Sequence, residues 1–106
     1  MDDFDLFISY VEWDDGGKRR PILVYVIDGD IVSVFNITSQ FETKSDAIKA
    51  HYYKINDWMQ AGLEKQSYVD TGKLIDLKKS TFDSKTPIGT LTYADKIALL
   101  AFLNKR

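Results

Sequence analysis

Three consecutive cations and two hydroxyl side chains are the residues of this sequence best suited to bind phosphate. Lys18, Arg19 and Arg20 form its densest positive cluster. The guanidinium group of arginine matches phosphate oxygens with two parallel hydrogen bonds. Thr38 and Ser39 supply hydroxyl groups further along the chain. A charge cluster is also common on a solvated face, so its function depends on the elements that hold it.

Those elements are two strands joined by a tight turn. Pro21 fixes φ and favours an extended backbone at Arg20, and the apolar run 22–27 predicts a strand buried on both faces. The Asp-Gly-Asp sequence at 28–30 predicts a hairpin turn. Arg20 and Thr38 lie equally far from the centre of this turn, so we expect them to face each other. The sequence therefore predicts a cation beside two hydroxyls at one end of a sheet.

Proton transfer has few candidate groups. His51 is the single histidine, so one subunit cannot supply a histidine acid and a histidine base, and a histidine beside two tyrosines is typical of a packed or surface strand. Asp70 lies at a predicted strand bend, where it is either an acid–base group or a turn residue. Phe41 follows the two hydroxyls on a polar loop and is placed to stack on a nucleobase. Most other aromatic residues are predicted to lie in the core.

Metal and cofactor chemistry has little support in the sequence. There is no cysteine, which excludes disulfides and cysteine-rich zinc sites. The aspartates Asp14, Asp15, Asp28 and Asp30 do not have the spacing of a calcium cage. Glycine-rich phosphate loops, serine nucleophile motifs and dinucleotide fingerprints are absent. We therefore expect no metal and no cofactor.

The N-terminal half holds two more predicted strands. Residues 5–13 are rich in aromatic and branched side chains and predict a largely buried strand. We expect Asp14-Asp15-Gly16-Gly17 to break it, because Asp-Gly is a turn signal, and a loop of about six residues ending in the three cations to follow. The polar segment 39–50 predicts a mobile loop with one helical turn near its end. Strand character resumes at 51–55.

Three elements complete the predicted order. Asp57 is placed to cap a short helix that ends at Gly62. Residues 66–77 predict a strand pair or one long strand, bent near Thr71 and Gly72. The terminal helix opens with a capping box at 92–95 and ends near residue 103. Its apolar surface is wider than one stripe, which predicts cover from the barrel on one side and a second subunit on the other.

Length and charge bound the class of protein. A chain of 106 residues predicts a single domain over residues 1–106. The net charge of −2 is unlike that of proteins that bind nucleic acid through bulk positive charge, so a nucleic-acid site must be local. The acidic N-terminus and the lack of a membrane-length apolar run favour the cytoplasm. The fold class we predict is mainly β with α, a small SH3-like β-barrel with a short helix and a C-terminal helix; a two-layer α+β sandwich is the alternative.

Four motifs resemble one family in its own order. They are Gly-Lys-Arg-Arg-Pro-Ile-Leu-Val at 17–24, Ile-Thr-Ser-Gln at 37–40, the segment 55–70, and Ile-Gly-Thr-Leu-Thr-Tyr-Ala-Asp at 88–95. Together they resemble the MazF/PemK toxins of bacterial type II toxin-antitoxin systems. The resemblance covers about residues 4–103 and implies a homodimeric SH3-like barrel. It also implies a metal-independent endoribonuclease, or mRNA interferase, that leaves a 2′,3′-cyclic phosphate and a 5′-hydroxyl.

The resemblance assigns roles to particular residues. It implies that Arg20, Thr38 and Asp70 are catalytic, with Arg20 stabilising the charged phosphorane. The residues expected to hold the RNA are Lys18, Arg19, Ser39, Phe41 and Lys73. The implied partners are single-stranded RNA and an antitoxin whose acidic segment occupies the groove at Arg20.

Two other functions are compatible with the same barrel. The first is a non-catalytic binding module, which either inhibits a protein target or is a decayed toxin homologue. The second is a ribosomal or translation-associated barrel without toxicity, which the low pI of about 5.3 disfavours.

Overall fold

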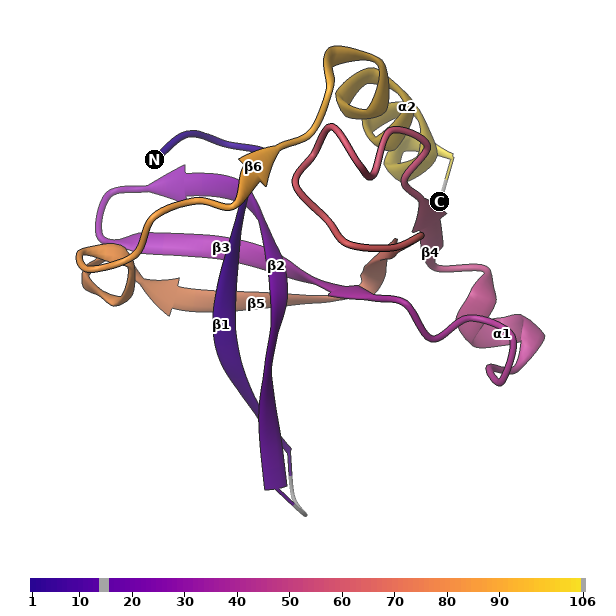
Figure 1. Ribbon diagram of the computed structural model, residues 1–106, viewed down its shortest axis with the longest axis horizontal. Helices are drawn as coiled ribbons and strands as arrows, with labels where there is room; N and C mark the ends of the chain where they lie inside the picture. The colour runs from indigo at the N-terminus through magenta and orange to yellow at the C-terminus, as the bar shows by residue number, and fades with distance from the viewer. Residues whose placement is uncertain (14–15, 106) are drawn as a thin grey trace.

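The computed structural model describes residues 1–13 and 16–105. Within them, six strands form one antiparallel sheet in the order β4-β5-β3-β2-β1-β6. The strands are β1 (Asp5–Trp13), β2 (Gly16–Asp28), β3 (Ile31–Thr38), β4 (Tyr52–Lys54), β5 (Tyr68–Lys78) and β6 (Gly89–Thr90). The helices are α1 (Asp46–Lys49), the 3-10 turn η1 (Lys79–Phe82) and α2 (Tyr93–Asn104). The sheet curls into a half-barrel (Figure 1), so the predicted mainly-β class with helices is confirmed.

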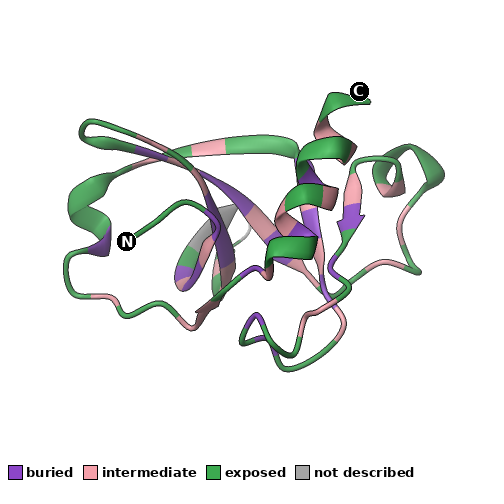
Figure 2. Ribbon diagram, turned by 90° about the horizontal axis from the view of Figure 1, so that it is seen from above, coloured by how far each residue is buried: buried purple, intermediate pink, exposed green. Residues whose placement is uncertain are grey.

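The sheet buries apolar side chains on both faces, as the alternation along β3 shows. Val32 and Val34 join a cluster that Phe82 of η1 closes. Phe35 and Ile37 point the other way, into a larger cluster covered by the segment after β4 and by α2. In Figure 2 the buried colour marks the central strands and one side of α2, while the opposite side of α2 is exposed. The sheet therefore has one apolar core on each face.

The predicted hairpin is confirmed. Gly29 has a φ of 59°, and Asp28 pairs with Ile31 across the turn. Further from the turn, Ile22 pairs with Asn36, which is the predicted register. The turn therefore brings the middle of β2, at Ile22, beside the end of β3.

The predicted loop before Arg20 is wrong. β2 already begins at Gly16, and Lys18 and Arg20 pair with Val11 and Ser9 of β1. The physical reason is that β1 continues to Trp13, so its backbone offers hydrogen-bond partners to the whole cationic stretch. Of the predicted break at 14–17, residues 14–15 lie outside the described residues, and the part at Gly16 and Gly17 is wrong because both belong to β2.

The predicted bend in the long strand is also confirmed. Asn36 of β3 pairs with Asp70, whereas the neighbouring Phe35 pairs with Leu74. The three residues between, 71–73, bulge away from β3. The backbone N–H of Thr71 still has a hydrogen-bond acceptor in this bulge, because it donates to the carbonyl oxygen of His51 at 2.9 Å.

The predicted short helix after Asp57 is wrong, although its end is as expected. The segment forms only turns, with Ala61 N donating to Asp57 O at 3.1 Å, and Gly62 has a φ of 92°. Asp57 does not cap these turns, because its carboxylate accepts the hydroxyl of Thr92 at 2.9 Å. A Cβ on Gly62 would collide with the carbonyl oxygen of Ile88. This close approach fixes the segment that follows Gly62 beside β6.

The terminal helix begins with the predicted capping box, since the backbone N–H of Asp95 donates to Thr92 Oγ1 at 3.3 Å. Leu99 is buried on the barrel side, while Ile97 is 50% exposed. The wide apolar surface is therefore covered from one direction in this chain, and cover by a second subunit stays a prediction. No helix among residues 1–13 and 16–105 has the length and apolar character to span a membrane.

Candidate functional site

A pocket opens where β2 and β3 separate. Among the described residues, their pairing ends at Ile22 and Asn36; beyond it β2 stays with β1, while Thr38 pairs with Tyr68 of β5. The two strand pairs diverge from this point (Figure 1). A cavity of about 410 Å³ lies between them. Its polar lining residues are Lys18, Arg19, Arg20, Thr38, Ser39, Gln40, Glu64, Lys65 and Ser67.

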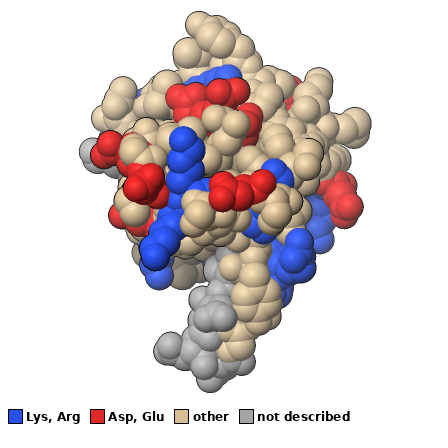
Figure 3. All heavy atoms as spheres, turned by 90° about the vertical axis from the view of Figure 1, so that its left-hand side faces the viewer, with Lys and Arg blue, Asp and Glu red and all other residues tan. Residues whose placement is uncertain are grey.

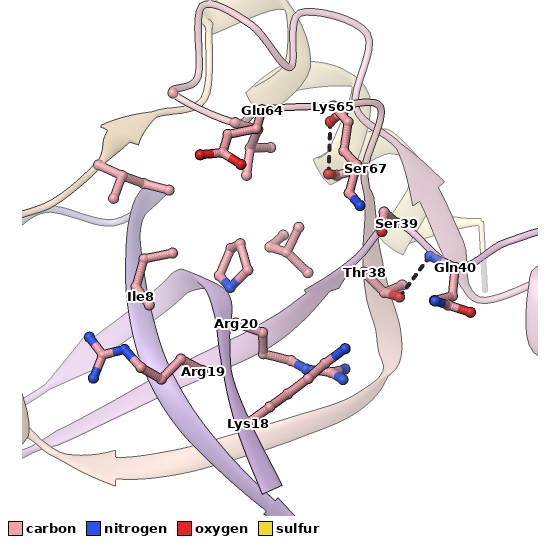
Figure 4. Close-up of a pocket in the computed structure, with 15 residues that line it drawn as sticks. Ile8, Lys18, Arg19, Arg20, Thr38, Ser39, Gln40, Glu64, Lys65 and Ser67 are labelled. Carbon is pink, nitrogen blue, oxygen red and sulfur yellow. Dashed lines mark hydrogen bonds between the residues drawn. The ribbon is translucent and has the colours of Figure 1, made fainter.

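The three cations enter this pocket from β2 in different directions. Successive side chains of a strand point to opposite faces, and in Figure 4 Arg19 points away from Lys18 and Arg20. Arg20 is half-buried, with its Nε atom fully buried, whereas Lys18 and Arg19 are exposed. Arg20 is thus the most restrained of the three cations, and it extends toward the β3 side of the pocket.

The hydroxyls lie at the end of β3. Thr38 Oγ1 accepts the backbone N–H of Gln40 at 3.0 Å. This bond uses a lone pair of the hydroxyl, so the hydroxyl proton is the part that can be donated to a ligand. Arg20 and Thr38 line one pocket from two diverging strands, although the predicted direct pairing between them does not form among the described residues.

The far wall of the pocket comes from a segment that sequence reasoning missed. Glu64, Lys65 and Ser67 border it on the side opposite Lys18 and Arg20 (Figure 4). Ser67 is 5% exposed, and its hydroxyl donates to the carbonyl of Lys65 at 2.9 Å. Glu64 brings a carboxylate to the pocket. The polar residues around Glu64 in the sequence could have suggested a site, but their spacing does not indicate that Glu64 lies opposite Arg20.

Asp70 lies outside the pocket lining. It sits in β5 between Asn36 of β3 and Tyr52 of β4, and its Oδ1 accepts the backbone N–H of Gly72 at 2.9 Å. Burial and the negative charge of Asp70 raise the pKa of Tyr52, while the charge of Arg20 lowers it. Asp70 and Arg20 therefore act on the same phenol, and Asp70 belongs to a strip of sheet beside the pocket.

The other two predicted RNA-binding residues also lie apart from the pocket lining. Lys73 is exposed in the bulge of β5 and does not line the pocket. Phe41 stacks on Tyr68, with ring centroids 4.4 Å apart and planes 13° from parallel. The structure thus joins Lys18, Arg19, Arg20, Thr38 and Ser39 in one place, and it leaves Asp70, Phe41 and Lys73 in others.

Metal ligands and surface charge complete the description of the site. Within the described ranges, no group of three or more histidine, aspartate or glutamate side chains could hold a metal ion. On the face shown in Figure 3, acidic and basic side chains are interspersed and neither sign covers it. Positive charge at the pocket is therefore a local feature of a chain with a net charge of −2. No protein-family model and no curated protein matches this chain.

Proposed function

We propose that this chain is a MazF/PemK-like toxin of a type II toxin-antitoxin system, an endoribonuclease that cleaves single-stranded RNA without a metal ion. The observation that carries the proposal is the pocket between β2 and β3, where a restrained arginine and two hydroxyl residues line one cavity. The curled antiparallel sheet is compatible with the small SH3-like barrel of that family. The cytoplasm is the compartment we propose for this activity.

The proposed reaction is an intramolecular transfer. The ribose 2′-oxygen forms a bond to phosphorus, the bond from phosphorus to the 5′-oxygen breaks, and the products are a 2′,3′-cyclic phosphate and a 5′-hydroxyl. Negative charge builds on the phosphoryl oxygens in the transition state, and Arg20 stabilises it because its donors are already fixed in place. Thr38 and Ser39 donate hydrogen bonds to the same oxygens. Arginine stays protonated in proteins, so it serves as the cation and not as the base.

Proton transfer needs an acceptor for the 2′-hydroxyl proton and a donor for the leaving 5′-oxygen. Glu64 is a carboxylate in the pocket wall, and Lys65 beside it is a cation with three donor protons. We assign the acceptor role to Glu64 and the donor role to Lys65. Asp70, the acid–base group implied by the resemblance, then orients Tyr52 and Arg20 from the adjoining strip.

Two protein partners belong to the proposal. An antitoxin with an acidic segment would cover the pocket, because carboxylates compete with phosphate for Arg20 and Lys18. A homodimer is the proposed oligomeric state. The exposed Ile97 and Leu100 of α2 offer one apolar surface on which a second copy can pack.

The proposed activity is tested with the purified chain and a long single-stranded RNA in excess EDTA, with the ends of the products mapped. We expect cuts that carry 2′,3′-cyclic phosphate and 5′-hydroxyl ends, and a rate that falls when Thr38 is changed to valine. Thr81→Val is the matched control, because Thr81 is exposed and does not line the pocket. Intact RNA, or cleavage that depends on added metal, contradicts the proposal. Glu64→Gln and Asp70→Asn then distinguish the two candidate bases, since only loss of the true base abolishes the pH dependence of the rate.

A non-catalytic binding module is the second candidate. The observation that favours it is that Glu64 is the one carboxylate among the described lining residues, and that it is exposed. In this case the chain binds RNA or an acidic protein through Arg20 but leaves RNA intact in the same assay.

A further inference from the structure

A polar and aromatic strip continues the floor of the pocket onto β5 and β4. Thr38 pairs directly with Tyr68, and Asp70, two residues further along β5, pairs with Tyr52. Paired residues in an antiparallel sheet point to the same face with their Cβ atoms about 5 Å apart. The ring of Tyr68 therefore begins one cross-strand step from the hydroxyl proposed to bind phosphate, and the ring of Tyr52 begins one strand further, beside Asp70.

Three rings gather on this strip. We call Phe41, Tyr52 and Tyr68 the aromatic platform. Phe41 and Tyr68 stack in parallel at 4.4 Å, and the Tyr52 ring lies 6.3 Å from each of them, tilted by 46° and 33°. Tyr52 lies beside the stacked pair and is not stacked on either ring. All three rings are only partly buried, which is unlike the core tyrosine Tyr53 at 7% exposed.

Charged side chains lie at both ends of the platform. Lys49 Nζ lies 4.8 Å from the centre of the Phe41 ring. At the other end, both Asp70 and Arg20 act on the Tyr52 phenol, the negative charge of Asp70 more strongly than the positive charge of Arg20. Two cations that flank a set of accessible rings match a nucleotide chain, whose bases are aromatic and whose phosphates are negative. A purely apolar peptide would gain nothing from either cation.

An unused acceptor lies on the same strip. Asn36 Oδ1 is buried and has no hydrogen-bond partner among the described residues. Asn36 pairs with Asp70 and shares the face of Thr38, two residues further along β3. A buried acceptor without a donor is unfavourable, so rotation of the Asn36 side chain toward an N–H group of a ligand would be favoured. The amino groups of nucleobases supply such donors.

We propose that the aromatic platform is a stacking subsite for one unpaired nucleobase of single-stranded RNA, adjacent to the phosphate held by Arg20 and Thr38. The identity of the ligand as RNA rests on the proposed function. The base stacks on Tyr52 against the Phe41–Tyr68 pair. Because every base has a flat π face, stacking selects single strands over duplexes without fixing one sequence. A rotated Asn36 side chain accepts a hydrogen bond from the edge of the base.

The test uses binding in place of cleavage. The probes are short 2′-O-methyl RNA oligonucleotides with a fluorescent end label, which lack the attacking hydroxyl and so survive the measurement. One series of probes carries an abasic sugar at each position in turn. Fluorescence anisotropy gives the dissociation constant for the unaltered chain, for Tyr52→Leu and for Phe41→Leu. Tyr93→Leu is the matched control, since Tyr93 is an exposed tyrosine of α2, away from the strip.

We expect one abasic position to weaken binding to the unaltered chain about 5- to 100-fold, the range for loss of one base–aromatic stack. Tyr52→Leu and Phe41→Leu should weaken binding of the complete probe by similar factors, and the same abasic position should then matter less than about twofold. Tyr93→Leu should bind like the unaltered chain. The wavelength of tryptophan emission and the midpoint of thermal unfolding verify that each variant is folded.

Three results overturn the subsite. They are the absence of probe binding, equal effects of all abasic positions, and variants of the platform that bind like Tyr93→Leu. Failure of the subsite is separable from failure of the proposed function. If unmodified RNA is cleaved and Tyr52→Leu binds the probe as the unaltered chain does, the subsite alone is rejected. If probe binding depends on one base and unmodified RNA stays intact, the ribonuclease activity alone is rejected.

Discussion

Substitution of Asp95 by asparagine tests how the pocket wall is held. Asp95 is 1% exposed and is the shared acceptor of three donors from β4 and the segment after it. Its Oδ1 accepts the hydroxyl of Tyr53 at 2.6 Å and the backbone N–H of Asn56 at 3.1 Å; its Oδ2 accepts the backbone N–H of Asp57 at 2.8 Å. This cluster ties α2 to the segment that leads into the pocket wall at Glu64.

The size of the effect follows from these three bonds. In Asp95→Asn one oxygen remains to accept from Tyr53 and Asn56, but the amide nitrogen faces the N–H of Asp57 and leaves that donor unsatisfied. A buried unsatisfied donor costs about 1–3 kcal/mol, and bonds to a charged acceptor are stronger than bonds to a neutral one by about 1 kcal/mol. We therefore expect a loss of about 2–4 kcal/mol in the free energy of unfolding.

Urea unfolding followed by tryptophan fluorescence measures this loss. The midpoint should fall while the slope with denaturant stays constant, because the substitution changes stability and not the surface exposed on unfolding. Asp83→Asn is the matched control, since Asp83 is exposed and surface substitutions change stability by less than about 0.5 kcal/mol. A loss below about 1 kcal/mol for Asp95→Asn would refute the view that this carboxylate holds the segment.

Further predictions concern pH, backbone contact and assembly. Burial, followed by the hydrogen bond to Asp95, raises the pKa of Tyr53 well above its ordinary value of 10.0. The unfolded chain therefore releases the phenol proton at lower pH than the folded chain. The contribution of Tyr53 to stability is complete below about pH 10 and is lost as the pH rises further. Urea midpoints at about pH 9 and 11 should fall less for Tyr53→Phe than for the unaltered chain, and an equal fall contradicts this assignment. Gly62→Ala should lower the unfolding free energy by more than about 2 kcal/mol, because its Cβ would meet the backbone of Ile88 at a positive φ; an unchanged midpoint rejects the close approach. Ile97→Glu should convert a proposed dimer to a monomer in analytical ultracentrifugation, and a dimer that persists moves the interface away from α2.

Local sequence chemistry was enough to predict the strands and the hairpin. Gly29 and its flanking aspartates define the turn, and the apolar run that follows Pro21 has no reasonable alternative to a buried strand. The predicted register matches the structure only on the side of Val24 that is further from the turn. Residue numbers of paired positions add up to 59 beside the turn and to 58 beyond Val24, because the strand register shifts by one at Tyr25. Nothing in the local sequence indicates that irregularity.

The site could be predicted only in part, for the same physical reason. Arg20 and Thr38 are near each other through one hairpin, which is a local contact. Glu64 reaches the pocket through long-range contacts, namely the packing of Gly62 on Ile88 and the hydrogen bond from the backbone N–H of Asp57 to the carboxylate of Asp95. Residues joined only by tertiary packing leave no periodic pattern in the sequence. The same holds for the aromatic platform, whose rings come from three separate segments.

The contrast between two adjacent arginines is the most direct test of the central claim, that Arg20 is the catalytic cation of the pocket. The measurement is the single-turnover rate of RNA cleavage in EDTA for Arg20→Ala and Arg19→Ala. Arg20 extends toward Thr38 and Arg19 points away (Figure 4). We expect Arg20→Ala to slow cleavage at saturating protein by about 10²–10³-fold, as for loss of a donor to a charged transition state, and Arg19→Ala to weaken RNA binding with little change in this rate. Equal rates for the two variants, or full activity of Arg20→Ala, would contradict the account.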